Sequence, residues 1–199
     1  VMVKQLMFGL AVVLVGCTNN LQQTSSVVAK VGMQLAKAEQ LKRYNVFIYL
    51  AQEQSLLAAK KLPSSKADSK LPLYGMTLAI KDNIEVAGMP HSVGHKLLAN
   101  YQPTTDAEVI KRVKMAGAIV LGKANMHELA YGITSNNAAF GAVANAYNEL
   151  KFAGGSSGGT AVAIALGLTD AGLGTDTGGS ARIPAALNGI VGFRPSTGR

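Results

Sequence analysis

Apolar residues recur at helical spacing along the first part of the chain. Between residues 27 and 62, apolar positions such as Val28, Val31 and Leu35 alternate with polar ones in steps of three and four. This spacing places apolar side chains on one face of an α-helix, so we predict that residues 27–62 are helical. The following segment 63–72 is rich in Ser and Lys, and it predicts a loop.

Further along, continuously apolar runs alternate with an amphipathic one. Residues 74–80 are a short apolar run that predicts a strand ending at Lys81. Residues 105–116 begin with a Thr-x-x-Glu capping pattern, continue with helical spacing and end before a glycine, which predicts a helix. Residues 118–121 are again wholly apolar, as in strands buried on both faces of a parallel sheet. Strand, helix, strand in this order predicts an α/β fold.

The last part of the chain is rich in glycine and small residues. Residues 132–160 lose periodicity and predict a loop, and residues 158–168 predict a small-residue helix. A second Gly/Ser loop, a short helix over 181–187 and a strand over 189–193 should follow. Because a parallel sheet ending there would have an uncovered edge, we expect residues 27–199 to be the N-terminal part of a single domain.

Composition excludes two classes of function. Hydrophobic residues make up 48% of the chain, which does not fit a disordered protein. The formal net charge is +8, but residues 1–70 hold nine Lys and Arg against three Asp and Glu. No aromatic residues alternate with these cations to stack on bases, so we predict no nucleic-acid partner. The excess of basic residues would instead form a solvated helix face or contact anionic lipid.

The single cysteine lies at the end of an N-terminal apolar run. Lys4 precedes the run at residues 6–15, and Gly16 precedes Cys17. A charged start, a short apolar centre and a small residue before cysteine resemble a bacterial lipoprotein signal. The run is about half of the roughly 20 residues that span a bilayer. One cysteine also excludes an internal disulfide and a paired-cysteine metal site.

We therefore expect three parts at the N-terminus. Residues 1–16 would be a lipoprotein signal peptide, Cys17 would carry the lipid, and residues 17–26 would be a polar tether. The protein would then be anchored to the membrane on the periplasmic side. The alternatives are an ordinary secretory leader with a chance cysteine, or a short buried helix.

Two motif matches are set aside. Residues 117–123 match the first part of a phosphate-binding loop, but Ala124 stands where Ser or Thr would hold magnesium. Residues 154–158 match G-x-S-x-G, but no clear strand precedes them and all three histidines lie upstream. We interpret the first match as structural and the second as weak.

Two Gly/Ser loops remain, and each opens a predicted helix. They are residues 154–159 and 175–180. Glycine runs let backbone N–H groups converge on a developing negative charge, and a helix N-terminus adds its dipole. A serine there needs a base, and a lysine kept neutral by desolvation can serve. Lys81, at the end of an apolar strand, is the candidate.

Several long motifs then resemble the amidase-signature family, in order and over residues 45–199. They are Leu78–Asn83, Gly154–Gly159, Gly174–Ala185 and Gly189–Arg199. The resemblance implies a mixed, mostly parallel sheet with helices on both faces.

The resemblance also implies roles for particular residues. Ser180 would be the nucleophile, and Ser156, on a cis peptide bond, would pass its proton to Lys81. The backbone amides from Thr177 to Ser180 would form the oxyanion hole. Two further motif residues, Gly178 and Gly179, would belong to the oxyanion loop. Three others would support the loops by hydrogen bonding, with a purely structural role as the alternative: Ser157, Asp176 and Arg182.

By this resemblance the chain would hydrolyse a small linear carboxamide to a carboxylic acid and ammonia, without metal or organic cofactor. Residues 126–137 and 183–187 look most like the indoleacetamide and mandelamide hydrolase branch. His127 in the first of these segments would lie either at a substrate pocket or on an ordinary helix. Two alternatives are the glutaminase-type subunit of a tRNA-dependent amidotransferase and a catalytically silent lipoprotein. The export signal argues against the former, and the three intact catalytic positions argue against the latter.

Overall fold

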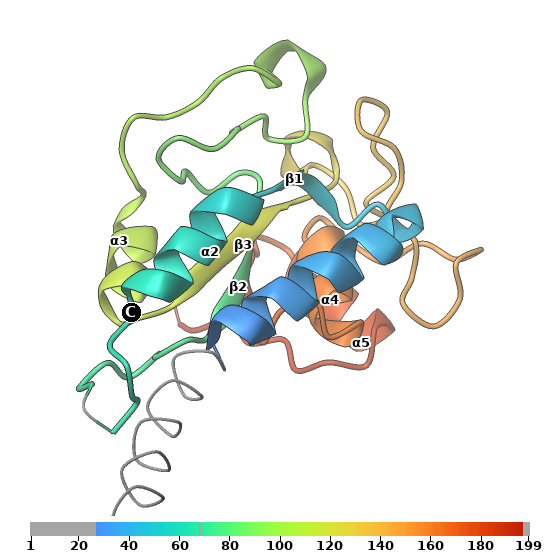
Figure 1. Cartoon of the computed structure of the whole chain (residues 1–199). Helices are drawn as coiled ribbons and strands as arrows, with labels where there is room; N and C mark the ends of the chain where they lie inside the picture. Colours follow the sequence, from blue (N-terminus) through green and yellow to red (C-terminus); the bar gives the residue numbers. More distant parts are fainter. Residues whose placement is uncertain (1–26, 68, 197–199) are drawn as a thin grey trace, which may run out of the picture.

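The computed structural model describes residues 27–67 and 69–196, in which helices pack around a four-stranded sheet (Figure 1). The strands are β1 (Phe47–Leu50), β2 (Thr77–Lys81), β3 (Ile119–Ala124) and β4 (Ala171–Leu173). The α-helices are residues 27–40, α2 (Gln52–Lys61), α3 (Glu108–Met115), α4 (Gly158–Ala165) and α5 (Arg182–Leu187). Short 3-10 turns occur at η1 (Lys42–Tyr44), η2 (Lys96–Leu98) and η3 (Glu128–Ala130).

The sheet is mixed and mostly parallel, as the motifs imply. Its strand order is β1-β3-β2-β4. β2 pairs in parallel with both β3 and β4, whereas β1 runs antiparallel to β3. The carboxyl ends of β2, β3 and β4 therefore meet at one edge of the sheet, where ligands and catalytic groups of open α/β sheets commonly lie.

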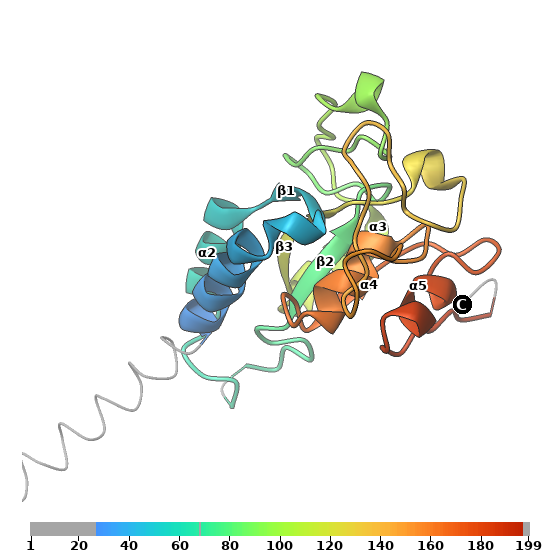
Figure 2. The same cartoon turned by 90° about the vertical axis from the view of Figure 1, so that its right-hand side faces the viewer.

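Helices cover both faces of the sheet. On β2, Ala79 packs with Val162 of α4, whereas Leu78 and Ile80 pack with Ile110 of α3. Because successive side chains of a strand point to opposite faces, α4 and α3 lie on opposite sides. Residues 27–40 and α2 lie side by side and form a third apolar cluster with β3 (Figure 2). The predicted α/β fold is confirmed.

The prediction of one continuous helix over residues 27–62 is wrong. The helix ends at residue 40, and the chain turns through η1 into β1 before α2 begins. Asn45 closes the turn in the left-handed conformation, with φ 55°. The aromatic and β-branched residues of β1 pair with β3, and this tertiary pairing outweighs the helical spacing of the flanking residues.

The predicted capping box of α3 is also wrong. The N-cap residue of α3 is Ala107, and no side chain caps the helix. The neighbouring carboxylate of Asp106 instead accepts a hydrogen bond from the Ala87 N–H (2.8 Å) and pairs with Lys114. The predicted stop is confirmed, because Gly117 follows the helix with φ +94°.

Two smaller differences concern the last part of the chain. The predicted strand over residues 189–193 is absent, and this segment has no regular structure up to residue 196. In the described residues this segment pairs with no strand, although the outer edge of β4 is unpaired, and a strand needs a partner for its backbone groups. Conversely, β4 forms over residues 171–173, directly before the second Gly/Ser loop, where no strand was predicted.

The predicted signal peptide, residues 1–16, and the tether, residues 17–26, lie outside the described residues. Among the described residues, no helix is long and apolar enough to cross a membrane.

Candidate active site

Lys81 is the last residue of β2, and its side chain is fully buried. All five residues of β2 are buried, because β3 and β4 flank the strand and helices cover both faces. The register pairs Lys81 with Ala124 of β3. A short apolar strand thus carries an ionisable amine into the interior, at the edge of the sheet where three strands end.

The first Gly/Ser loop brings Ser156 to this edge. The Gly155–Ser156 peptide bond is cis, as the family resemblance implied, and the Ser156 side chain is fully buried. The backbone N–H of His127 donates to the Ser156 carbonyl (3.1 Å). A Cβ atom at Gly159 would lie 2.4 Å from the Asn125 carbonyl oxygen, so only glycine lets α4 approach the end of β3 this closely.

Lys81 contacts two hydroxyl groups. Its Nζ lies 2.6 Å from Ser156 Oγ and 2.7 Å from Thr175 Oγ1. The Asn83 amide also donates to Thr175 Oγ1 (3.1 Å). Burial lowers the pKa of the Lys81 ammonium to about 8, although the Asp176 carboxylate acts in the opposite direction. About one molecule in ten would then hold a neutral amine at pH 7.

The second Gly/Ser loop is organised by Asp176, whose side chain is only 4% exposed. Its carboxylate accepts both guanidinium contacts of Arg182 at 3.0 Å. It also accepts the backbone N–H groups of Gly179 (2.7 Å) and Ala181 (3.1 Å). The Arg182 guanidinium and these N–H groups hold the pKa of Asp176 well below its usual range. The carboxylate therefore stays charged and fixes the loop around Ser180.

Ser157 joins the two loops. Its N–H donates to the Ser180 carbonyl (3.0 Å), and its hydroxyl donates to the Thr175 carbonyl (3.2 Å). The Ser180 residue is partly buried beside them. Among the hydrogen bonds of the described residues, none joins the Ser156 and Ser180 hydroxyls. The structure thus forms the Lys81–Ser156 contact and holds the backbone of Ser180 against the same loop.

The predicted oxyanion loop is partly engaged. The N–H of Gly179 donates to Asp176, so it does not point freely outward. Thr177 and Gly178 are exposed, and within the described residues their N–H groups and that of Ser180 have no hydrogen-bond acceptor. These three amides are the ones available to a bound oxyanion.

Two further residues lie in this site. Thr175 and Asn83 are both inside the motifs, but the family resemblance implies no role for their side chains. The structure places the Thr175 hydroxyl between Lys81 and Asn83. A polar residue flanking a predicted catalytic position was the only signal, and sequence spacing does not reveal which hydroxyl meets the amine.

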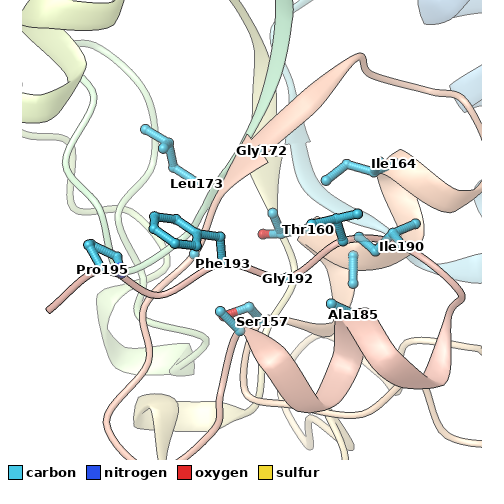
Figure 3. A pocket seen from close by; sticks show the side chains of 14 residues that line it. Ser157, Thr160, Ile164, Gly172, Leu173, Ala185, Ile190, Gly192, Phe193 and Pro195 are labelled. Atoms are coloured by element: carbon cyan, nitrogen blue, oxygen red, sulfur yellow. The ribbon is translucent and has the colours of Figure 1, made fainter.

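A large cavity lies beside the site and not at Lys81. It holds about 440 Å³ along β4, between α4, α5 and the segment that follows α5 (Figure 3). Its lining is mainly apolar and includes Leu173, Ile164, Ile190 and Phe193. Ser157 lines it, but Lys81, Ser156 and Ser180 do not. We therefore assign it no role in the chemistry.

The three histidine side chains contact residues other than the proposed catalytic ones. His95 Nδ1 lies 2.5 Å from Glu128 Oε1, and His127 Nδ1 lies 3.3 Å from Thr134 Oγ1. His91 packs edge-on against Tyr101. In the part of the chain that the structure describes, no three His, Cys, Asp or Glu residues gather as metal ligands would.

Comparisons with known proteins agree with this geometry. Residues 31–199 match the family model described as Amidase. A glutamyl-tRNA(Gln) amidotransferase subunit of Chlorobium limicola (strain DSM 245 / NBRC 103803 / 6330) is 44% identical over 157 residues, 78% of this chain and 33% of that protein. Native peptide amidase from Stenotrophomonas maltophilia superposes with a TM-score of 0.81 at 34% identity, over 89% of this chain and 39% of that one.

A crystal structure described as an amidase superposes with a TM-score of 0.80 at 43% identity, over 87% of this chain and 40% of that one. The chain spans about a third of the length of the curated relatives that it matches. The match to the family model covers most of the chain, and the cis Gly155–Ser156 bond and the Lys81–Ser156 contact lie within it. The chain therefore belongs to the Amidase family, the amidase-signature family that its motifs resemble.

Proposed function

We propose that the protein hydrolyses a small carboxamide through a covalent acyl-enzyme on Ser180. One observation carries the proposal: the buried Lys81 amine, with a pKa lowered to about 8, lies 2.6 Å from Ser156 Oγ. A lysine in this state accepts a proton near neutral pH, which is what activation of a serine requires.

The proposed reaction has two halves. Ser180 Oγ attacks the amide carbon while its proton passes to Ser156, whose own proton passes to Lys81. The available amides of the 177–180 loop receive the developing oxyanion. The proton then returns through Ser156 to the nitrogen, ammonia leaves, and an acyl ester remains on Ser180. Water attacks this ester by the same route and releases the carboxylic acid.

The relay requires one contact that this structure does not contain. Ser180 Oγ must turn toward Ser156 when substrate binds, since the two hydroxyls are not hydrogen-bonded here. Asp176 and Ser157 support the turn by fixing the backbone on either side of Ser180. The scheme assigns no step to a metal or organic cofactor.

For the substrate we propose a linear carboxamide of aryl-acetamide type. The support is the likeness of residues 126–137 and 183–187 to indoleacetamide and mandelamide hydrolases. The backbone of the first segment contacts the catalytic loop, because His127 donates to the Ser156 carbonyl.

A second candidate function is glutamine hydrolysis for a partner enzyme. Curated relatives about 44% identical to the chain are named as subunits of glutamyl-tRNA(Gln) amidotransferase, and this name favours the candidate. Ammonia release from glutamine that rises when the other amidotransferase subunits are added would support it. Release from aryl-acetamides without partners would support the first candidate.

The first test is labelling of the full 199-residue chain with a fluorophosphonate, followed by peptide mapping. Label on Ser180 that is lost in Ser180→Ala and strongly reduced in Lys81→Ala would support the acyl-enzyme scheme. A folded chain that takes up no label would mean that Ser180 is not activated in these 199 residues, and labelling of a longer chain would then distinguish a catalytically silent fold from missing residues.

We also propose that the protein is lipid-anchored at Cys17 on the periplasmic side of a bacterial membrane. The support is the order Lys4, apolar run, Gly16 and Cys17 in the sequence. Growth with a labelled fatty acid should label the wild-type chain and not Cys17→Ser. Equal labelling of both would contradict the anchor.

A further inference from the structure

We propose that a buried ion pair, Asp82–Lys123, is a positioning device that holds Lys81 at its place in the site. The inference rests on the proposed function, because it concerns the base of that reaction. Among the hydrogen bonds and ion pairs of the described residues, none joins either member of the pair to Ser156 or Ser180. Neither member is therefore placed in the chemistry itself.

The pair is fully enclosed. Lys123 Nζ lies 3.1 Å from Asp82 Oδ1, and both side chains are 0% exposed. Among the described residues, Asp82 Oδ1 has no hydrogen-bond partner beyond this ion pair. Burial lowers the pKa of Lys123, while the carboxylates of Asp82 and Glu85 act against that shift.

The Asp82 carboxylate binds several groups of the loop that follows β2. Its Oδ2 atom accepts the Ser92 N–H (2.8 Å) and the Gly94 N–H (3.4 Å). The Ser92 hydroxyl donates to the same oxygen. Lys123 adds a bond to the Pro90 carbonyl (2.7 Å). The two charges therefore tie the returning loop to the ends of β2 and β3.

The pair lies on the opposite face of the sheet from Lys81. The register matches Ile80 with Lys123 and Lys81 with Ala124, and side chains alternate between the faces of a strand. The side chain of the base therefore points away from the pair. Any effect of the pair on the base must pass through the backbone that Lys81 and Asp82 share.

That backbone is held from both sides. The Asp82 N–H donates to the Ala124 carbonyl (3.1 Å), and the Asp82 side chain is held by Lys123. On the other face, Lys81 and Asn83 both reach Thr175. Residues 81–83 therefore alternate between the catalytic loops and the buried pair. Releasing the middle residue should let the Lys81 amine drift from Ser156 and become hydrated.

The proposal predicts a change in the pKa of Lys81 itself. Groups that face Lys81 are the Ser156 and Thr175 hydroxyls and the Asp176 carboxylate with its Arg182 partner. None of them is altered by a change at the pair. In the double variant D82N/K123M, which removes both charges together, a shift toward the ordinary lysine pKa would therefore report the loss of burial that follows from misplacement.

The experiment uses the full 199-residue chain labelled with 13C at the lysine ε carbons and titrated by NMR. The Lys81 resonance is the one missing in Lys81→Met. Its pKa should rise by at least about one pH unit in Lys123→Met, Asp82→Asn and the double variant D82N/K123M. Lys60→Met, on the exposed surface of α2, is the matched control and should leave it unchanged.

Fluorophosphonate labelling of the same proteins gives the second measurement. The amplitude reports the folded fraction, and the rate constant reports the reactivity of each folded molecule. We expect the rate constant near neutral pH to fall about tenfold or more in the pair variants. A purely structural role would lower only the amplitude.

The double variant guards against simple unfolding, because replacing a buried pair by neutral residues is often tolerated. If it folds and its Lys81 pKa and rate constant match the wild type, the proposal is overturned. If the wild type takes up no label, the proposed function fails, and the NMR titration still decides whether the pair positions Lys81.

Discussion

Two lysines lie buried at the ends of neighbouring parallel strands, and their surroundings differ. Lys81 ends β2 and contacts two neutral hydroxyls, whereas Lys123, near the end of β3, contacts a carboxylate. Burial lowers the pKa of both. Lys123 is in direct contact with the Asp82 carboxylate, which stabilises its charged form. The Asp176 carboxylate raises the pKa of Lys81, but it is not among the hydrogen-bond partners of Lys81 in the described residues.

The difference distinguishes the proposed base, Lys81, from the proposed anchor, Lys123. A buried ammonium without an ion pair loses its proton easily, so it serves as a proton acceptor near neutral pH. A buried ammonium with a carboxylate in contact keeps its charge and fixes the chain around it. Strand position alone does not distinguish the two, because both lysines end apolar runs.

The largest expected effect is on the rate. Lys81→Met removes the proposed base while preserving bulk, so the fluorophosphonate labelling rate of Ser180 should fall by about a thousandfold or more. Time courses of labelling, quenched at intervals and resolved on gels, measure this rate. An equally large fall in Lys60→Met would show that the loss is not specific to the site.

The next effect is on stability, and here replacing Lys123 should have a larger effect than replacing Lys81. Lys123→Met leaves the Asp82 carboxyl group without its cationic partner in the interior, which should lower the free energy of unfolding by about 3–5 kcal/mol. Lys81→Met leaves only neutral hydroxyls and should cost far less. Urea unfolding followed by circular dichroism measures both; equal losses would remove the distinction between base and anchor.

A smaller effect is expected at Thr175. Thr175→Val keeps the shape but removes the hydroxyl that accepts from Lys81 and Asn83. Since a hydrogen bond to a charged group contributes about 1.5–3 kcal/mol, we expect a loss of about ten- to a hundredfold in kcat/KM, with the Ser180 label still detectable. Thr175→Ser should retain most of the rate, and a similar loss there would argue against the hydroxyl as the cause.

The smallest effect is a shift in pH dependence. The rate should rise with pH through about 8, as Lys81 loses its proton. The Asp176 carboxylate raises the pKa of Lys81, so Asp176→Asn should move the midpoint of the rate profile to lower pH. The plateau should also fall, because the loop loses its contact with Arg182. A midpoint that moves to higher pH would contradict the assignment.

Motifs predicted one of the two contacts of the relay as the structure has it, but not the packing that brings the groups together. Lys81 and Ser156 were predicted as partners and lie 2.6 Å apart. The role of Thr175 was not predicted, since adjacent residues of a loop can point in any direction. The Asp82–Lys123 pair depends on a register that contains an irregularity after Leu78, which local sequence does not encode.

The fold shows the same division. The β2, α3 and β3 units follow from local periodicity, and the structure confirms them. β1 was missed, because its short apolar run between two helices becomes a strand only by pairing with β3. The capping box is absent because α3 begins later than predicted, at Glu108 with Ala107 as its N-cap, and the preceding Asp106 binds the Ala87 N–H and Lys114. Such long-range partners are not visible in a single sequence.

The closeness of α4 to the strand ends has a consequence for mutational scanning. A Cβ atom at Gly158 would lie 2.4 Å from the Ser135 hydroxyl oxygen, and one at Gly159 would collide with the backbone of Val46 and Asn125. In a library of all single substitutions, these glycines and Ser156 would score alike for activity. Sorting the same library by folded abundance would separate them, since the serine variants should accumulate normally and the glycine variants should be degraded.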